Sequence, residues 1–138
     1  MEAFSEYGHA LASVAGMVLM WAVLSPLSSI KKEKAGAEVG AAPAEDYENS
    51  ASRWYRAYMN LTETMPFFVG AVGTAMLAGA SAFWVNLLAS LFLVSRIAAA
   101  YVHIQGIGKK SGGPRSMLFV VGWACCIVLA ILAIVAVF

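Results

Sequence analysis

Residues 117–138 are MLFVVGWACCIVLAILAIVAVF, a run without a charged side chain. A spanning helix needs about 20 mostly apolar residues, because the hydrocarbon core of a bilayer is about 30 Å thick. Three earlier stretches, at about 10–30, 60–80 and 82–105, are also long and mostly apolar. The sequence therefore predicts an all-α integral membrane protein, a bundle of four transmembrane helices.

The composition of the whole chain agrees with this class. Of its 138 residues, 61% are hydrophobic and only 12% are charged, and the mean hydropathy is +0.75, far from the balance of a soluble domain. The net charge of +1 lacks the basic footprint that nucleic acid requires, so no nucleic-acid partner is expected. Cys125 and Cys126 are neighbours inside an apolar run, and we expect small buried side chains there rather than a disulfide or a metal site.

Residues 1–138 are expected to form one membrane domain. The second helix is expected to begin ahead of the membrane, with Ser50 or Ser52 as its N-cap. The loop before it is rich in Ala, Gly and Glu, which predicts little intrinsic order. The uncharged junction 78–82 predicts a tight hairpin between the second and third helices. The helices are expected at about 10–30, 53–80, 82–105 and 116–138, and the polar loops at about 31–52 and 106–114.

The nine basic residues gather around the two polar loops. One group surrounds the first loop and the other surrounds the second: Lys31, Lys32, Lys34, Arg53 and Arg56, then Arg96, Lys109, Lys110 and Arg115. The positive-inside rule places both loops in the cytoplasm and both chain termini outside. Lys109 and Lys110 are expected to solvate their loop or to meet anionic lipid headgroups.

Three polar residues share one face of the second helix. Arg56, Asn60 and Glu63 are spaced at i, i+4 and i+7, so their side chains lie on one side of the helix near the bilayer. Ionisable groups in a membrane segment are costly and by default mark a functional interior. A structural alternative remains open, in which Glu63 pairs with Arg96 and Asn60 bonds to a neighbouring backbone.

Basic and aromatic side chains are expected to meet at the cytoplasmic ends of the helices. They are Arg53, Arg56, Arg96, Tyr101, His103 and Arg115. Such a basic mouth suits an anionic, carboxylate-bearing ligand. Arg115 opens the fourth helix, where an anion such as a thiolate is favoured. Ser116 would donate a hydrogen bond to that anion or simply cap the helix, and His103 has an alternative structural role.

The motif Arg53-x-x-Arg56-Ala57-x-x-Asn60-x-x-Glu63-x-x-Pro66 resembles that of the MAPEG family, the membrane-associated proteins in eicosanoid and glutathione metabolism. Arg96-x(4)-Tyr101 and Pro114-Arg115-Ser116 resemble its second conserved block. The resemblance implies a homotrimer that binds glutathione, as co-substrate, between adjacent subunits near the cytoplasmic face.

The resemblance also implies roles for individual residues. Arg56, Asn60 and Glu63 would hold the glutathione backbone, and Arg115 would activate its thiol, with Ser116 as an alternative donor. Arg53 and Arg96 would support the carboxylates of the ligand or the packing of the helices. The predicted catalytic residues are therefore Arg115 and Ser116, and the predicted binding residues are Arg53, Arg56, Asn60, Glu63, Arg96, Tyr101 and His103.

The expected activity is that of a glutathione transferase or peroxidase acting on a lipophilic electrophile or a lipid hydroperoxide from the bilayer. The composition favours a bacterial inner membrane, although an endoplasmic-reticulum protein would have the same topology. The alternative from another class is a noncatalytic membrane protein that binds an anionic lipid or metabolite, or assembles with another membrane protein. A channel or transporter is disfavoured, because the polar residues cluster at one end of the helices.

The chain departs from the family pattern at four places. Met59 stands where characterised mammalian members have a basic residue. Ser28-Ser29-Ile30 ends the first helix without the arginine often found there, unless Lys31 or Lys32 takes its place. Phe119 replaces an expected aromatic hydroxyl, and His103 takes a position that is often tyrosine. These departures weaken the resemblance at the glutathione site and leave the fold little affected.

Overall fold

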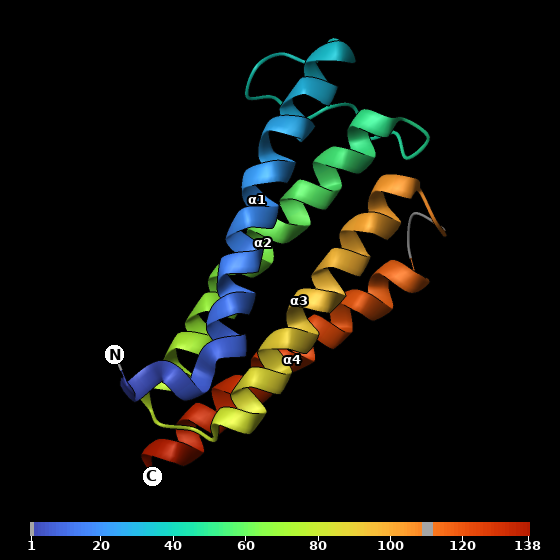
Figure 1. Cartoon of the computed structure of the whole chain (residues 1–138). Helices are drawn as coiled ribbons and strands as arrows, with labels where there is room; N and C mark the ends of the chain where they lie inside the picture. The colour runs from blue at the N-terminus through green and yellow to red at the C-terminus, as the bar shows by residue number, and fades with distance from the viewer. Residues whose placement is uncertain (1, 109–111) are drawn as a thin grey trace.

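The computed structural model describes residues 2–108 and 112–138 as a bundle of four long helices preceded by a short 3₁₀ helix. The elements are η1 (Glu2–Tyr7), α1 (Gly8–Lys34), α2 (Ser50–Leu77), α3 (Ala82–Gln105) and α4 (Pro114–Val137). The helices alternate in direction, so both chain ends and the α2–α3 link lie at one end of the bundle (Figure 1). The loop 35–49 and the facing ends of α3 and α4 lie at the other. Lys109 and Lys110 lie outside the described residues.

The bounds of α1, α2 and α4 differ from the expected ones, whereas those of α3 agree. Asn49 is the N-cap of α2, and its side-chain oxygen accepts a hydrogen bond from the backbone N–H of Ala51 at 2.9 Å, so the prediction of Ser50 or Ser52 was wrong. The helix ends at Leu77 because Gly79 takes a left-handed backbone conformation with φ of 71°. In α1, the helix continues through Lys34, where basic side chains complement the helix dipole.

Three of the helices in the described part of the chain are long and apolar enough to cross a membrane. These spans are Phe4–Lys34, Ala82–Gln105 and Pro114–Val137. The helix α2 has 28 residues and packs along α1, α3 and α4, but polar residues such as Asn60 and Glu63 lower its hydropathy. The all-helical bundle is therefore confirmed. Of the four predicted spans, three are long and apolar enough to cross a membrane.

Small residues line the inner faces of the helices and let the backbones approach closely. On α3 the buried residues are Val85, Ala89, Phe92, Ser95, Arg96, Ala99 and Ala100. The rings of Phe68 on α2 and Phe92 on α3 stack with their centroids 4.0 Å apart. Many large aliphatic side chains lie on the outer surface, for example Leu19 and Val135, which are 68% and 69% exposed. Small residues at helix contacts and an apolar outer surface are typical of packing within lipid.

Two side chains hold the bundle together at the end that carries the chain termini. The hydroxyl of Tyr7 donates a hydrogen bond to the Ala80 carbonyl at 2.6 Å. Asn86 on α3 accepts one from the Ala10 backbone N–H at 2.9 Å and donates one to the Glu6 carbonyl at 2.7 Å. These contacts fix the start of α1 against the α2–α3 link and the beginning of α3.

Tyr7→Phe should destabilise the fold without touching the opposite end of the bundle. The change leaves the buried Ala80 carbonyl without its donor, which costs about 1–3 kcal/mol. Thermal and denaturant unfolding in detergent should show a lower midpoint than wild type. Tyr101→Phe, which alters a side chain that is 59% exposed, is the control and should leave the midpoint unchanged. Equal midpoints for all three proteins would contradict a stabilising role for the Tyr7 hydroxyl.

Candidate functional site

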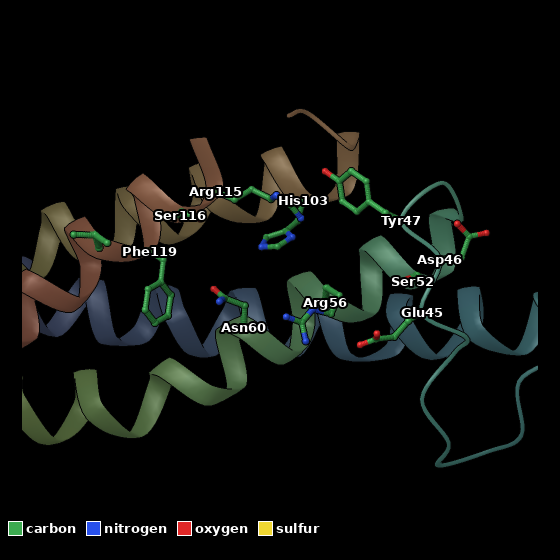
Figure 2. Close-up of a pocket in the computed structure, with 11 residues that line it drawn as sticks. Glu45, Asp46, Tyr47, Ser52, Arg56, Asn60, His103, Arg115, Ser116 and Phe119 are labelled. Atoms are coloured by element: carbon green, nitrogen blue, oxygen red, sulfur yellow. The ribbon is translucent and has the colours of Figure 1, made fainter. Parts of the chain in front are cut away.

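A polar cavity of 330 Å³ lies at the loop end of the bundle, between α2, α3, α4 and the loop 35–49. Ser52, Arg56 and Asn60 line it from α2, since their spacing of four residues puts them on one helix face. From the other helices, the cavity is lined by His103 of α3 and by Arg115, Ser116, Phe119 and Val120 of α4. Figure 2 shows the labelled side chains in the space between α2 and the pair α3 and α4.

Arg96 crosses the bundle beneath this cavity and joins three helices. Its side chain is only 2% exposed, and its Nη1 donates to Asn60 Oδ1 on α2 at 3.0 Å. Its Nη2 donates to the Leu118 carbonyl on α4. The expected alternative in which Arg96 pairs with Glu63 is therefore wrong. Of the two roles that the resemblance left open for Arg96, the contacts support helix packing.

The Arg96 contact also fixes the orientation of the Asn60 amide. Because the amide oxygen accepts from Arg96 at 3.0 Å, the amide N–H₂ group is the part of Asn60 that remains to donate to a ligand in the cavity. A guanidinium has no acceptor, so the reverse orientation would place two donors against each other. Asn60 therefore offers the cavity a donor, as an anionic or carbonyl-bearing ligand requires.

The loop 35–49 covers one side of the cavity, which was not predicted from the sequence. Glu45, Asp46 and Tyr47 all line it. Figure 2 shows the Glu45 carboxylate directed toward Arg56, whereas Asp46 points away; an Asp46 oxygen accepts from the backbone N–H of Glu48 at 3.0 Å. The only sequence signal for this arrangement is a short run of acidic and aromatic residues just before the α2 N-cap.

Arg53 holds the loop in place. Its Nη1 donates to the carbonyls of Tyr47 at 2.9 Å and Glu48 at 2.8 Å, and its Nε donates to the Ile104 carbonyl at 3.2 Å. A Cβ at Gly106, which has a positive φ of 69°, would lie 3.1 Å from Arg53 Cδ. Arg53 therefore ties the loop to the end of α3, and it does not line the cavity.

Tyr47 lies directly against Arg115. The Arg115 Cζ is 4.4 Å from the centroid of the Tyr47 ring, within the range of a cation–π contact. Two buried polar atoms near this pair, the Tyr47 hydroxyl and His103 Nδ1, have no hydrogen-bond partner within the described residues. Buried polar groups are nearly always hydrogen-bonded, so each such atom calls for an explanation.

A second cleft, which is apolar and has a volume of 810 Å³, lies between α2 and α4 next to the polar cavity. Phe67 and Ala71 line it from α2, and Trp123 and Ile127 line it from α4. Glu63 lines this cleft and not the polar cavity. Phe119 lines both spaces, and Figure 2 shows its ring pointing from α4 toward α2. The ring therefore forms part of the boundary between a polar and an apolar space.

The predicted site residues thus fall into four groups. The polar cavity brings together Arg56, Asn60, His103, Arg115 and Ser116. Glu63 lies beside it in the apolar cleft, and Arg53 and Arg96 support the structure around it. Tyr101 lines neither space, and its side chain is 59% exposed. No cluster of three metal-ligating side chains occurs within residues 2–108 and 112–138.

The apolar spans and the cavity define a class, a small helical membrane protein with an arginine-lined cavity near one end. Comparison with known families is more specific, since the model of the MAPEG family matches residues 8–135. The chain belongs to the MAPEG family and is an integral membrane protein, as the motif resemblance predicted. No curated protein and no solved structure matches the chain.

Gly122→Ala should disturb the cavity through Arg96. A Cβ at Gly122 would lie 2.8 Å from Arg96 Nη2 and 3.1 Å from Ser95 Oγ, so the guanidinium must shift away from its partners. Overpacking of this kind costs about 1–3 kcal/mol, which should appear as a lower unfolding midpoint in detergent. Gly73→Ala is the matched control, because a Cβ there meets nothing within 4 Å. A Gly122→Ala midpoint equal to that of the control would contradict the close packing of Arg96.

Proposed function

We propose that this protein is a glutathione-dependent membrane enzyme that acts on a lipophilic electrophile or lipid hydroperoxide. The observation that carries the proposal is the convergence of Arg56 and Asn60 from α2 with Arg115 and Ser116 from α4 in one cavity. These residues belong to two motifs far apart in the sequence, and MAPEG family membership fits a glutathione-related function.

The cavity is lined by charged side chains of both signs, as glutathione itself carries. Glutathione carries two carboxylates and one ammonium group, and Arg56 and Arg115 provide guanidinium groups that pair well with carboxylates or a thiolate. Glu45, directed toward Arg56 (Figure 2), provides an acidic partner for the ammonium group. The cavity volume of 330 Å³ lies at the lower end of the range of about 300–1,000 Å³ that is usual for small-ligand sites.

Arg115 is placed to favour the reactive form of the ligand. It lies in the first turn of α4, where its own charge and the helix dipole both stabilise an anion. A thiolate held there is the nucleophilic form of the sulfur. In conjugation, the sulfur lone pair forms the new bond to an electrophilic carbon, the leaving group departs with its bonding electrons, and the thiol proton goes to water.

The apolar cleft is the space that we assign to the second substrate. It lies between α2 and α4, is lined mainly by apolar side chains and meets the polar cavity at Phe119. Lipid-soluble electrophiles concentrate in the bilayer, so a cleft at the level of the spans would receive them from the membrane. Under this proposal, Phe119 separates the site of the thiol from the site of the electrophile.

The membrane arrangement completes the proposal. The seven basic residues that the structure describes lie at the loop end of the bundle or, for Arg96, in the half of α3 nearer that end. With the positive-inside rule, this supports cytoplasmic loops and outer termini. We further propose that α2 crosses the bilayer with its polar face inward, that three copies assemble into a homotrimer, and that the protein resides in a bacterial inner membrane.

Arg115→Ala should abolish the signal of bound thiolate. Titration of the detergent-solubilised protein with glutathione should give a saturable ultraviolet difference absorbance from the thiolate in wild type, and none in the variant. Lys34→Ala, which removes an exposed basic residue outside the cavity, is the charge control and should keep the signal. Absence of both the absorbance and calorimetric binding in wild type would instead favour a noncatalytic family member that binds another anion.

Asn60→Asp should distinguish the role of the amide oxygen, which binds Arg96, from the role of the amide N–H₂ group, which faces the ligand. A carboxylate keeps the acceptor for Arg96 but replaces the donor that faces the ligand with a second anionic oxygen. The fold should therefore persist, with an unfolding midpoint close to that of wild type. Glutathione affinity measured by calorimetry should fall roughly 10- to 100-fold, the range expected when a hydrogen bond to a charged group is lost. Unchanged affinity would show that Asn60 does not bind the ligand.

A further inference from the structure

The phenolic hydroxyl of Tyr47 is buried in the polar cavity without a partner among the described residues. A buried tyrosine hydroxyl normally finds a hydrogen-bond partner, because leaving it unsatisfied forfeits its hydration. The side chain is half-buried overall, and its hydroxyl oxygen is enclosed. Because Tyr47 lines the cavity, a ligand bound there could supply the partner that the hydroxyl lacks.

The position of Tyr47 is set by contacts that do not involve its hydroxyl. Arg53 binds the carbonyls of Tyr47 and Glu48 at 2.9 and 2.8 Å, and the ring lies over the Arg115 guanidinium at 4.4 Å. Backbone and ring are thus held before any ligand binds. Holding a donor in advance reduces the ordering cost when a ligand arrives.

The hydroxyl of Tyr47 lies near the group that attracts an anion. The Arg115 Cζ is 4.4 Å from the centroid of the ring, and the N–H donors of an arginine point outward from the edge of the guanidinium plane. Figure 2 shows the hydroxyl end of Tyr47 turned toward Arg115. An anion bound at the edge of Arg115 would therefore lie within reach of both groups.

The residues of α4 leave a place for such a donor. Phe119 lines the cavity, and phenylalanine cannot donate a hydrogen bond. Ser116 is the hydroxyl that α4 itself contributes to the cavity wall. Tyr47, which reaches the cavity from the loop 35–49, adds a phenol beside Arg115.

We propose that Tyr47 is a ligand-binding residue whose hydroxyl donates a hydrogen bond to the sulfur of the bound thiolate beside Arg115. The inference rests on the proposed function, since it names the group that would meet the reacting atom of glutathione. A hydrogen bond to the charged form favours that form, so Tyr47 and Arg115 would both increase the fraction of bound thiolate.

The test combines one hydroxyl deletion with one change in the ligand. Tyr47→Phe keeps the ring over Arg115 and removes only the donor. Its affinity is measured by calorimetry for glutathione and for the analogue in which a methyl group replaces the thiol. Tyr55→Phe is the matched control, because the Tyr55 ring lies over Lys32 at 5.3 Å and lines neither the cavity nor the cleft.

Tyr47→Phe should weaken glutathione binding roughly 10- to 100-fold, the loss expected for a hydrogen bond to an anion, and should leave the affinity for the methyl analogue unchanged. The pH at which thiolate absorbance appears should move upward, because the anionic sulfur loses a donor. Tyr55→Phe should change neither affinity. Unfolding midpoints confirm that both variants retain the fold.

Three other results would overturn the inference. Equal weakening of both ligands by Tyr47→Phe would place the hydroxyl on another part of the ligand or make its role structural. Glutathione binding and thiolate absorbance that are the same in Tyr47→Phe and wild type would remove the role entirely, while the proposed function stands. Failure of wild type to bind glutathione would overturn the proposed function and this inference together.

Discussion

The buried guanidinium of Arg96 is the group on which the loop end of the bundle depends. A charge inside a membrane protein is costly unless its donors are satisfied, and Arg96 meets this requirement with Asn60 on α2 and the Leu118 carbonyl on α4. The rings of Phe92 and Phe119 lie 5.4 and 5.6 Å from its Cζ, and Gly122 leaves room for it. One side chain thus fixes the spacing of three helices and the orientation of a residue in the cavity wall.

The class of fold and part of the site could be predicted because they depend on local patterns. The uncharged run 117–138 is long enough to span a bilayer, and the spacing of Arg56 and Asn60 puts both on one helix face whatever surrounds them. The N-cap of α2 was assigned to serine because serine and asparagine satisfy the same helix N–H groups. Sequence alone gives no reason to prefer one of several neighbouring caps.

The remaining features depend on partners that a sequence pattern does not reveal. The partners of Arg96 and Arg115 are not evident in the sequence: Arg96 donates to a backbone carbonyl of α4, and Arg115 lies against the ring of Tyr47. Tyr47 is held at the cavity by Arg53, which binds the carbonyls of Tyr47 and Ile104, and by the contact of its ring with Arg115. Composition predicted a polar loop with little intrinsic order at about 31–52, and residues 35–49 contain no helix or strand. It did not reveal that a side chain of α2 would bind the carbonyls of this loop and of α3.

The ring of Phe119, shared by the polar cavity and the apolar cleft, has a consequence for reactants of opposite solubility. A charged peptide and an oil-soluble molecule seldom meet in bulk, since each is scarce where the other is abundant. Two spaces that share the residue Phe119 let each reactant remain in its own phase until the two meet there. Under the proposed function, the protein would hold glutathione in the polar cavity and the electrophile in the apolar cleft. The size of the side chain at position 119 would then determine how closely the two reactants approach.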